Sequence, residues 1–173
     1  MDLKTYTHKD AAEIREMLLD MHDAVYDGEE DCFHERERFA WFVDHWSGKK
    51  SWSCVVGFEE GAPTGFAYGA AFDSGGWWKG SDRPASVAPE ATAFALSELM
   101  VLERWRKTGV STRLHEALLD SRDEDIATLL VDVTHPKVRA LYETWSYEQI
   151  GEQKPFDDSP TFAIMVKRLT APA

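Results

Sequence analysis

The sequence predicts an α/β layered domain with a mixed sheet, and three observations support this fold class. Segments with strand and helix patterns follow in the order strand, two helices, three strands, helix, strand, helix, two strands. The chain has 173 residues, 43% hydrophobic and 12% aromatic, which is enough for a sizeable core. One strand leads through a turn at Gly109 into an amphipathic helix. We therefore expect a single domain over residues 1–173.

The first half of the chain contains three of the expected strands and two of the expected helices. Residues 3–7 predict a short strand. The runs 51–58 and 64–72 predict two more, joined by a hairpin connection at 59–63. Between the first strand and this pair, apolar residues recur at helical spacing in two sets: Ile14, Met17, Leu18 and Met21, then Phe39, Phe42, Val43 and Trp46. Each set predicts a helix with one apolar face.

The second half alternates strands with helices. A long loop at 73–92 precedes a strand at 93–101, and later strands are expected at 127–133, 147–154 and 161–169. Two helices separate these strands, with apolar faces formed by Val110, Leu114, Ala117 and Leu118, and by Val138, Leu141, Tyr142 and Trp145. Because no repeat or long linker interrupts the chain, one layered domain accounts for all of it.

Composition excludes several classes of protein. The formal net charge of −12 counts against nucleic-acid binding and favours a cationic partner. Cys32 and Cys54 are far apart and are expected to be reduced, and the histidines show no metal-ligand spacing, so no metal site is predicted. The amino terminus lacks an apolar signal core, and no run reaches the about 18 apolar residues of a membrane span. We expect a cytoplasmic protein without a membrane partner.

Residues 99–111 predict an anion-binding turn between a strand and a helix. The first backbone N–H groups of a helix have no intrahelical acceptor, and the helix dipole adds to their attraction for an anion. Gly109 allows the backbone to approach a ligand closely. Positive charge surrounds the turn, carried by Arg104, Arg106, Lys107 and Arg113. A glycine before a helix is common, so a second motif is needed to identify the ligand.

The second motif is the segment from His135 to Tyr147, which follows a strand and contains Ala140 and Tyr142. Together with Arg106-x-x-Gly109-x-Ser111, it resembles the GNAT N-acetyltransferase superfamily over roughly residues 93–154. The sequence departs from the family pattern at two places. Ser111 replaces a usual Gly or Ala, and Ser146-Tyr147 replaces a Gly-Phe pair.

The resemblance implies a mixed, mostly antiparallel sheet flanked by helices and splayed between the fourth and fifth strands. It also implies acetyl-CoA as cosubstrate, with pantetheine along the fourth strand and pyrophosphate on the turn. A main-chain N–H near Met100 would polarise the thioester carbonyl. The implied cofactor-binding residues are Leu99, Met100, Val101, Arg106, Lys107, Thr108, Gly109, Val110 and Ser111.

An amine acceptor needs a base, because its reference pKa of ~10.4 keeps it charged at neutral pH. Forming the free amine costs roughly 4.6 kcal/mol. Glu98 and Asp132 are the candidate bases and His135 is a third, although each acid could equally face solvent or pair with an arginine. The resemblance implies that Tyr142 hydrogen-bonds the departing thiolate, and the alternative is a core tyrosine.

The acceptor is predicted to be a small cationic amine, such as an antibiotic amine or a polyamine. Trp77 and Trp78 with Glu29, Glu30 and Asp31 would attract such a cation, unless the tryptophan loop folds back on the core. The predicted function is therefore acetyl-CoA-dependent N-acetylation of a primary amine. The alternatives are a protein N-terminal or lysine acetyltransferase, and a non-catalytic CoA-binding sensor. Family members are often dimers, so a homodimer is possible.

Overall fold

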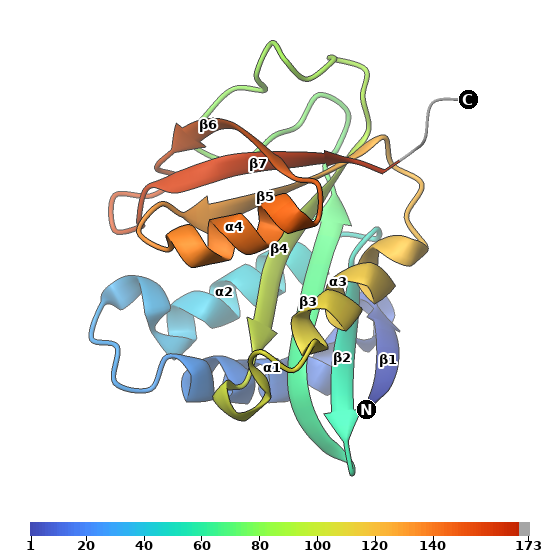
Figure 1. The fold of residues 1–173 in the computed structure, drawn as a ribbon, viewed down its shortest axis with the longest axis vertical. Coiled ribbons are helices and arrows are strands. Elements are labelled where there is room, and N and C mark those ends of the chain that lie inside the picture. Colours follow the sequence, from blue (N-terminus) through green and yellow to red (C-terminus); the bar gives the residue numbers. More distant parts are fainter. Residues whose placement is uncertain (170–173) are drawn as a thin grey trace. The chain divides into compact units, whose positions relative to one another are not determined.

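The computed structural model describes residues 1–169, and its helices and strands follow the predicted order (Figure 1). The strands are β1 (Asp2–Thr7), β2 (Ser53–Glu59), β3 (Ala62–Ala71), β4 (Ala93–Val101), β5 (Ile126–Asp132), β6 (Glu148–Gln153) and β7 (Phe162–Arg168). The helices are α1 (Ala11–Val25), α2 (Arg36–Ser47), α3 (Val110–Asp120) and α4 (Pro136–Thr144). Short 3₁₀ helices lie at η1 (His8–Asp10), η2 (Cys32–His34) and η3 (Glu103–Trp105).

The strands form a seven-stranded sheet in the order β1-β2-β3-β4-β5-β7-β6. The β4–β5 pair is parallel and joins residues 93–95 to residues 126–128, whereas β1–β2, β2–β3, β5–β7 and β6–β7 are antiparallel. The predicted mixed, mostly antiparallel sheet is thus confirmed. The divergence of β4 from β5 beyond their paired residues stays a prediction.

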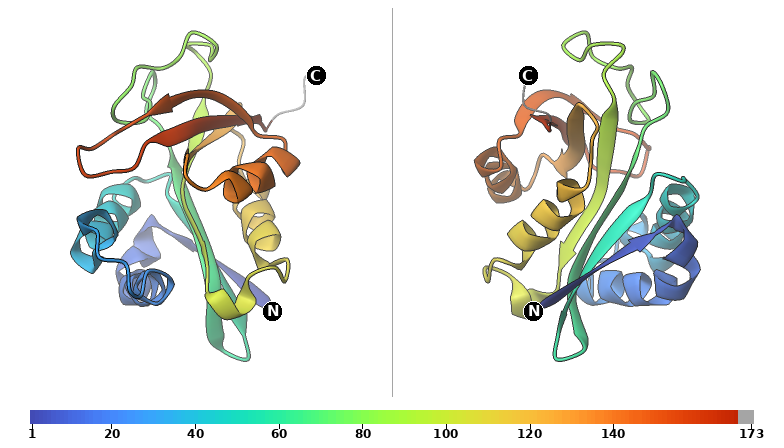
Figure 2. Two further views of the ribbon diagram at one scale, coloured as in Figure 1. Left: turned by 60° about the vertical axis from the view of Figure 1, so that its left-hand side comes forward. Right: turned by 90° about the vertical axis from the view of Figure 1, so that its right-hand side faces the viewer.

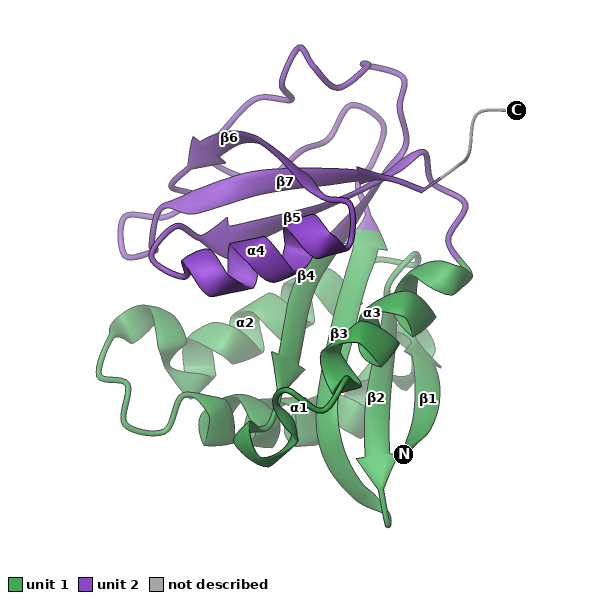
Figure 3. Ribbon diagram, in the orientation of Figure 1, with its two compact units in different colours: residues 1–70, 96–121 green, residues 71–95, 122–173 purple. Residues whose placement is uncertain are grey.

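The chain divides into two compact units (Figure 3). Unit 1 consists of Met1–Ala70 and Leu96–Ser121, and unit 2 consists of Ala71–Ala95 and Arg122–Ala173. The single domain predicted over residues 1–173 stays a prediction, and its last four residues lie outside those described.

In unit 1, helices cover both faces of the strands. Figure 2 shows α1 and α2 on one face of β2 and β3, with α3 on the other. The apolar stripes predicted for α1 and α2 supply Ile14, Leu18, Phe39 and Val43 to a buried cluster. The strands contribute Cys54, Val56, Phe66, Tyr68 and Met100 to the same cluster. The helical periodicity in the sequence therefore identified the core face of both helices.

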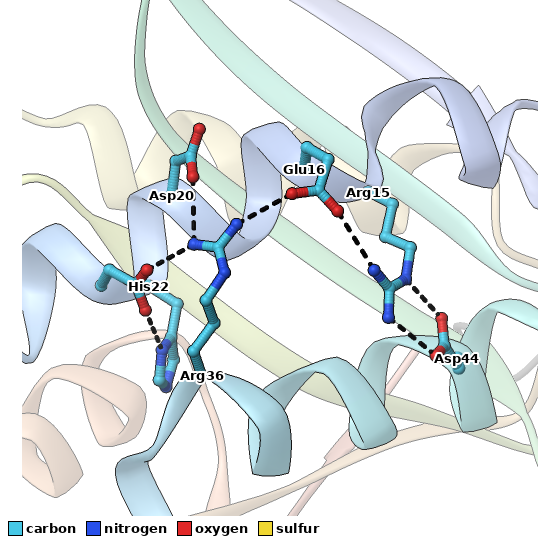
Figure 4. A network of polar contacts seen from close by, with 7 residues as sticks. Arg15, Glu16, Asp20, His22, Arg36 and Asp44 are labelled. Carbon is cyan, nitrogen blue, oxygen red and sulfur yellow. Dashed lines mark hydrogen bonds and ion pairs between the residues drawn. The ribbon is translucent and has the colours of Figure 1, made fainter.

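Two sets of ion pairs fix α1 against α2 (Figure 4). Arg15 on α1 binds Asp44 on α2 through Nε at 2.8 Å and Nη2 at 3.0 Å. Arg36, at the start of α2, binds Glu16 at 2.9 Å, Asp20 at 3.0 Å and also Asp23. The Arg15 and Arg36 pairs are exposed to solvent, which screens them, so their main effect is to align the helices rather than to stabilise the fold.

Gly65 lets β3 lie very close to the end of β4. A Cβ atom on Gly65 would stand 2.4 Å from the Met100 carbonyl oxygen and 3.0 Å from the Val101 Cα. Any side chain there would force the two backbones apart, because both nearest atoms are main-chain atoms. The position of the β4 segment that precedes the Gly109 turn thus depends on this glycine.

β4 also contains one residue more than β3 over the stretch where they run together. Hydrogen bonds join Phe72 N to the Ala93 oxygen and Leu102 N to the Thr64 oxygen. Between these bonds β3 advances eight residues and β4 advances nine. An extra residue of this kind is a β-bulge, which changes the direction of the side chains near it.

In unit 2, the loop between β3 and β4 packs against the strands. Trp78 is buried, and its Nε1 donates a hydrogen bond of 3.0 Å to Thr128 Oγ1 on β5. Trp77 packs on Phe72, with ring centroids 5.8 Å apart. Arg83 closes the loop by donating to the carbonyl oxygens of residues 76, 88 and 91. The loop therefore folds back on the interior of this unit, which was the alternative interpretation of the tryptophan pair.

Candidate functional site

The turn that follows β4 is locally well defined. The backbone N–H groups of Trp105 and Arg106 donate to the carbonyl oxygens of Leu102 and Glu103. Lys107 has a φ of 61° and Gly109 a φ of 87°, so the chain passes twice through the left-handed region before α3 begins at Val110. Glycine is favoured at such a position because it has no Cβ atom. The helix start predicted after Gly109 is confirmed.

The first turn of α3 presents free backbone donors. The first bond of the helix runs from Arg113 N to the Gly109 oxygen at 3.2 Å, so the N–H groups of residues 110–112 have no acceptor within α3. Gly109 supplies no side-chain cap, and within residues 1–169 nothing lies within 4 Å of the position its Cβ would take. An anionic group fits this open helix start.

The cationic side chains near this turn are held close to it. Arg106 donates from Nε to the Val101 oxygen at 3.3 Å, and Arg113 donates from Nη2 to the Met1 oxygen at 3.2 Å. Arg104 stacks over the Trp105 ring at 5.1 Å. Lys107 is exposed. Since each arginine keeps further N–H groups, the turn retains positive charge for an anion, and its binding stays a prediction.

Glu98 lies on β4 immediately before the predicted cofactor segment. The residue is only partly exposed, and burial of its carboxyl group raises the pKa to about 8. A carboxyl group with this pKa is ionised in a large fraction of molecules only near and above pH 8. Proton acceptors are most effective when their pKa lies near the working pH, and the role of Glu98 as a base stays a prediction.

Asp132 ends β5 and shapes the turn into α4. Its Oδ1 accepts hydrogen bonds from Thr134 N and Thr134 Oγ1, both at 2.8 Å. Its Oδ2 lies 3.6 Å from His135 Nε2. Pro136 then occupies the first position of α4. The alternative to a catalytic role was that Asp132 faces solvent or pairs with an arginine. Asp132 is in fact paired, but with Thr134 and His135. Its role as a base stays a prediction.

Tyr142 is fixed by the way α4 ends. Ser146 N donates to the Glu143 oxygen at 3.1 Å, and Tyr147 N donates to the Tyr142 oxygen at 3.2 Å. These two bonds form a Schellman motif, which usually includes an apolar contact between the same end residues. Here the rings of Tyr142 and Tyr147 meet edge to face with centroids 5.8 Å apart. Tyr142 is buried, so the core position and the predicted contact with a thiolate both stay open.

The departure from the family pattern at Ser146 has a direct structural cost. Ser146 has a φ of 71°, in the left-handed region that the Schellman motif requires of this residue. A glycine adopts this conformation with less strain than a serine. The glycine that is usual in the family at this position therefore suits the left-handed φ, which Ser146 adopts in this chain with strain.

The predicted acceptor-binding residues have different surroundings. Glu29 and Glu30 are exposed in unit 1. Asp31 caps η2 by accepting from His34 N at 3.0 Å, and its carboxylate lies 2.8 Å from His34 Nδ1, a bond that lowers the pKa of Asp31. In unit 2, Trp78 has the packing role described above. Contact of these residues with an acceptor stays a prediction.

Tyr68 was missed in the sequence, although it lies beside Glu98 in unit 1. The negative charge of Glu98 contributes to a raised pKa of the Tyr68 phenol, after the larger effect of burial. The pattern at residues 64–72 predicted a strand, yet the neighbour of Glu98 depends on how β3 and β4 pair. No local signal in the sequence gives that register.

Comparison with known proteins identifies the family. The chain belongs to the GNAT acetyltransferase family, because the model of the Acetyltransferase (GNAT) family matches residues 13–147. The resemblance seen in the two motifs is thus confirmed. A search of curated proteins found no match.

Solved structures of similar fold include two aminoglycoside acetyltransferases. Aminoglycoside 6'-acetyltransferase type Ii has a TM-score of 0.67 at 16% identity, with 100% of each chain covered. An aminoglycoside 6'-N-acetyltransferase complexed with coenzyme A has a TM-score of 0.65 at 16% identity, covering 100% of this chain and 99% of that one. Ard1 from Thermoplasma volcanium has a TM-score of 0.64 at 14% identity, with 98% of each chain covered. These likenesses establish the fold.

Two other kinds of site were sought over residues 1–169. None of the helices there has the length and apolar character needed to cross a membrane. In the same residues, no group of three or more His, Cys, Asp or Glu side chains is placed to hold a metal ion.

Replacing Ser146 with glycine is expected to stabilise the protein by about 0.5–1 kcal/mol, because glycine relieves the left-handed strain at the end of α4. The free energy of unfolding, measured by urea denaturation, tests this. Ser121→Gly at the end of α3, where φ is −97°, is the matched control and should not stabilise. Equal or lower stability of Ser146→Gly would contradict this explanation of the family glycine.

Proposed function

We propose that this protein is an acetyl-CoA-dependent N-acetyltransferase that acts on the primary amine of a small cationic molecule. One observation carries the proposal: β4 contains Glu98, with its pKa near 8, and runs through residues 99–101 directly into the open helix start at Gly109. A single strand and turn would thus supply a base, an extended backbone for the cosubstrate and an anion site, one after another along the chain.

The backbone of β4 and the turn fit the cosubstrate. The free N–H groups of residues 110–112 and the cations Arg106 and Lys107 would hold the pyrophosphate. The strand backbone at residues 99–101 would bind the pantetheine arm, with an N–H near Met100 directed at the thioester oxygen. Bound acetyl-CoA supplies the activated acetyl group.

Glu98 would remove the proton from the acceptor ammonium group. Forming the free amine still costs roughly 4.6 kcal/mol at neutral pH, and the ionised Glu98 carboxylate would give the departing proton an acceptor within the site. Tyr142 would donate a hydrogen bond to the departing sulfur. Asp132 is the second candidate base, although its Oδ1 already accepts two hydrogen bonds within the turn before α4.

A cationic small molecule is the acceptor class that the chain favours. The net charge of −12 attracts cations, and Glu29 and Glu30 are exposed in unit 1. Two of the structures with a similar fold are aminoglycoside acetyltransferases. A protein amino terminus or lysine as acceptor, and a CoA-binding sensor without turnover, are the competing outcomes of the experiments below.

Gly109→Val is expected to weaken acetyl-CoA binding at least about tenfold, because a branched residue cannot hold a φ of 87° without strain and would disturb the helix start. Isothermal titration calorimetry tests this. Gly61→Val is the matched control, since Gly61 has a φ of 81° and also has open space around it. Equal losses in both variants would indicate general destabilisation, and unchanged binding in both would remove the anion site from the proposal.

Tyr142→Phe is expected to lower turnover about 10- to 100-fold while acetyl-CoA affinity is kept, because only the hydroxyl is lost. Thiol release from acetyl-CoA, with polyamines, aminoglycosides and peptides as acceptors, measures it. Tyr147→Phe removes a hydroxyl from the same ring cluster and serves as the control. Unchanged turnover of Tyr142→Phe would exclude Tyr142 from the mechanism. Turnover with peptides but with none of the small amines would contradict the proposed small-molecule acceptor and favour a protein acceptor.

For wild-type protein, kcat/KM is expected to rise with pH up to about 8, because Glu98 accepts a proton only when ionised and its raised pKa keeps it protonated below that pH. Glu98→Gln is expected to lower kcat/KM by about 10²- to 10⁴-fold and to abolish this acid limb. The exposed Glu116→Gln is the control. An acid limb that persists in Glu98→Gln would transfer the role of base to another group.

A further inference from the structure

Tyr68 lies entirely inside unit 1, on the strand next to the one that carries Glu98. Its side chain has no exposed surface. The ring packs against Trp52, at a centroid distance of 5.7 Å, and against Phe66, at 6.0 Å. The position of the ring is therefore constrained by two aromatic neighbours.

Tyr68 and Glu98 occupy similar levels on the neighbouring strands β3 and β4. The bond from Leu102 N to the Thr64 oxygen joins β4 to β3, and Glu98 and Tyr68 are each four residues from it. Counted from this bond, Glu98 and Tyr68 lie opposite each other on the two strands, or one residue apart where the extra residue of β4 falls between them and the bond. The charge of Glu98 also contributes to the raised pKa of the Tyr68 phenol, in agreement with their places on neighbouring strands.

Within residues 1–169, the Tyr68 hydroxyl has no hydrogen-bond partner. Buried hydroxyl groups are nearly always bonded, so an exception in a folded core calls for an explanation. The simplest acceptor is the neighbouring carboxyl group once it is ionised, because a carboxylate is a stronger acceptor than a carboxylic acid.

The other titratable groups around Tyr68 are neutral over the working pH range. Cys54 pairs with Tyr68 across β2 and β3, and burial raises the pKa of its thiol. Tyr6 on β1, which lies opposite Cys54, also has a raised pKa. On α1, burial lowers the pKa of His22 to about 4, so its imidazole is uncharged near neutral pH. Glu98 is then the group beside Tyr68 whose charge changes near pH 8.

We propose that Tyr68 is a positioning residue for Glu98: its hydroxyl donates a hydrogen bond, directly or through one water, to the carboxylate that takes the proton from the acceptor amine. This rests on the proposed function, which makes Glu98 the base. The proton moves from the substrate nitrogen to a Glu98 oxygen. Tyr68 keeps its own proton throughout, because burial and the nearby carboxylate raise its pKa well above 10.

The proposal predicts a shift of one titration in a known direction. A donor to the charged form favours ionisation, so Tyr68→Phe should raise the pKa of Glu98 by about 0.5–1 unit. The fraction of ionised Glu98 at pH 7, and kcat/KM with it, should then fall about 3- to 10-fold. Above the new pKa the variant should recover wild-type kcat, which a merely structural loss would not allow.

Carbon-13 NMR of the side-chain carboxyl groups in the free protein tests this without turnover. Glu98→Gln identifies the resonance, Tyr68→Phe gives the shift, and Tyr6→Phe is the control that removes a phenol on β1. We expect an upward shift in Tyr68→Phe alone. An unchanged or lowered Glu98 pKa overturns the inference. If Tyr68→Phe does not fold, incorporation of 3-fluorotyrosine, a stronger donor, should shift the Glu98 pKa downward.

The same variants separate this inference from the proposed function. Acetyl transfer with a Glu98-dependent acid limb, together with an unshifted NMR titration, leaves the function standing and rejects Tyr68. In the opposite case, the NMR titration of Glu98 shifts in Tyr68→Phe, but the acid limb of kcat/KM does not depend on Glu98. This result rejects the positioning role, because Glu98 is then not the base.

Discussion

The close backbone approach of β3 to β4 at Gly65 is the contact on which the arrangement of unit 1 depends. Because Gly65 has no side chain, the Met100 carbonyl and the Val101 Cα lie where a Cβ atom would otherwise stand. That contact holds β4, which carries Glu98, against the strand that carries Tyr68, and it lies at the end of β4 from which the Gly109 turn departs. The absence of a side chain at Gly65 thus matters for both Glu98 and the start of α3 at Gly109, because both belong to the chain segment that runs along β4 and into the turn.

The termini of α3 and α4 show how backbone geometry and chemistry are connected in this fold. Gly109 places the chain in a left-handed conformation before α3 and leaves its first N–H groups without acceptors. At the other helix, Ser146 takes a similar conformation and brings Tyr147 back against Tyr142. The candidate anion site and Tyr142 are therefore positioned by local hydrogen bonds that leave open or close a helix end, whereas Glu98 is positioned by strand β4.

Much of the fold of unit 1 could be predicted from residue spacing, because the core face of a helix and the residue at which a helix begins are local properties of the sequence. The stripes of α1 and α2 and the start of α3 after Gly109 followed from periodicity and turn chemistry. Two features depend on residues distant in sequence, which periodicity does not identify: Trp78 donates its N–H to Thr128 on β5, and Tyr68 lies on the strand next to that of Glu98. Asp132 is held locally, by Thr134 in the turn that it begins, and residue spacing alone does not distinguish this structural position from a catalytic one.

The ion pairs between α1 and α2 have a consequence for motion. Arg15 joins the first half of α1 to Asp44 near the end of α2, while Arg36 joins the start of α2 to Glu16, Asp20 and Asp23 along α1 (Figure 4). The ion pairs therefore reach from the first half of α1 to its last turn. A hinge at either end would break one set of contacts, which leaves the connecting segment at residues 26–35 as a span anchored on both sides. Glu29 and Glu30 lie in this span, so their two negative charges are carried by a segment whose ends are both held by the helix pair.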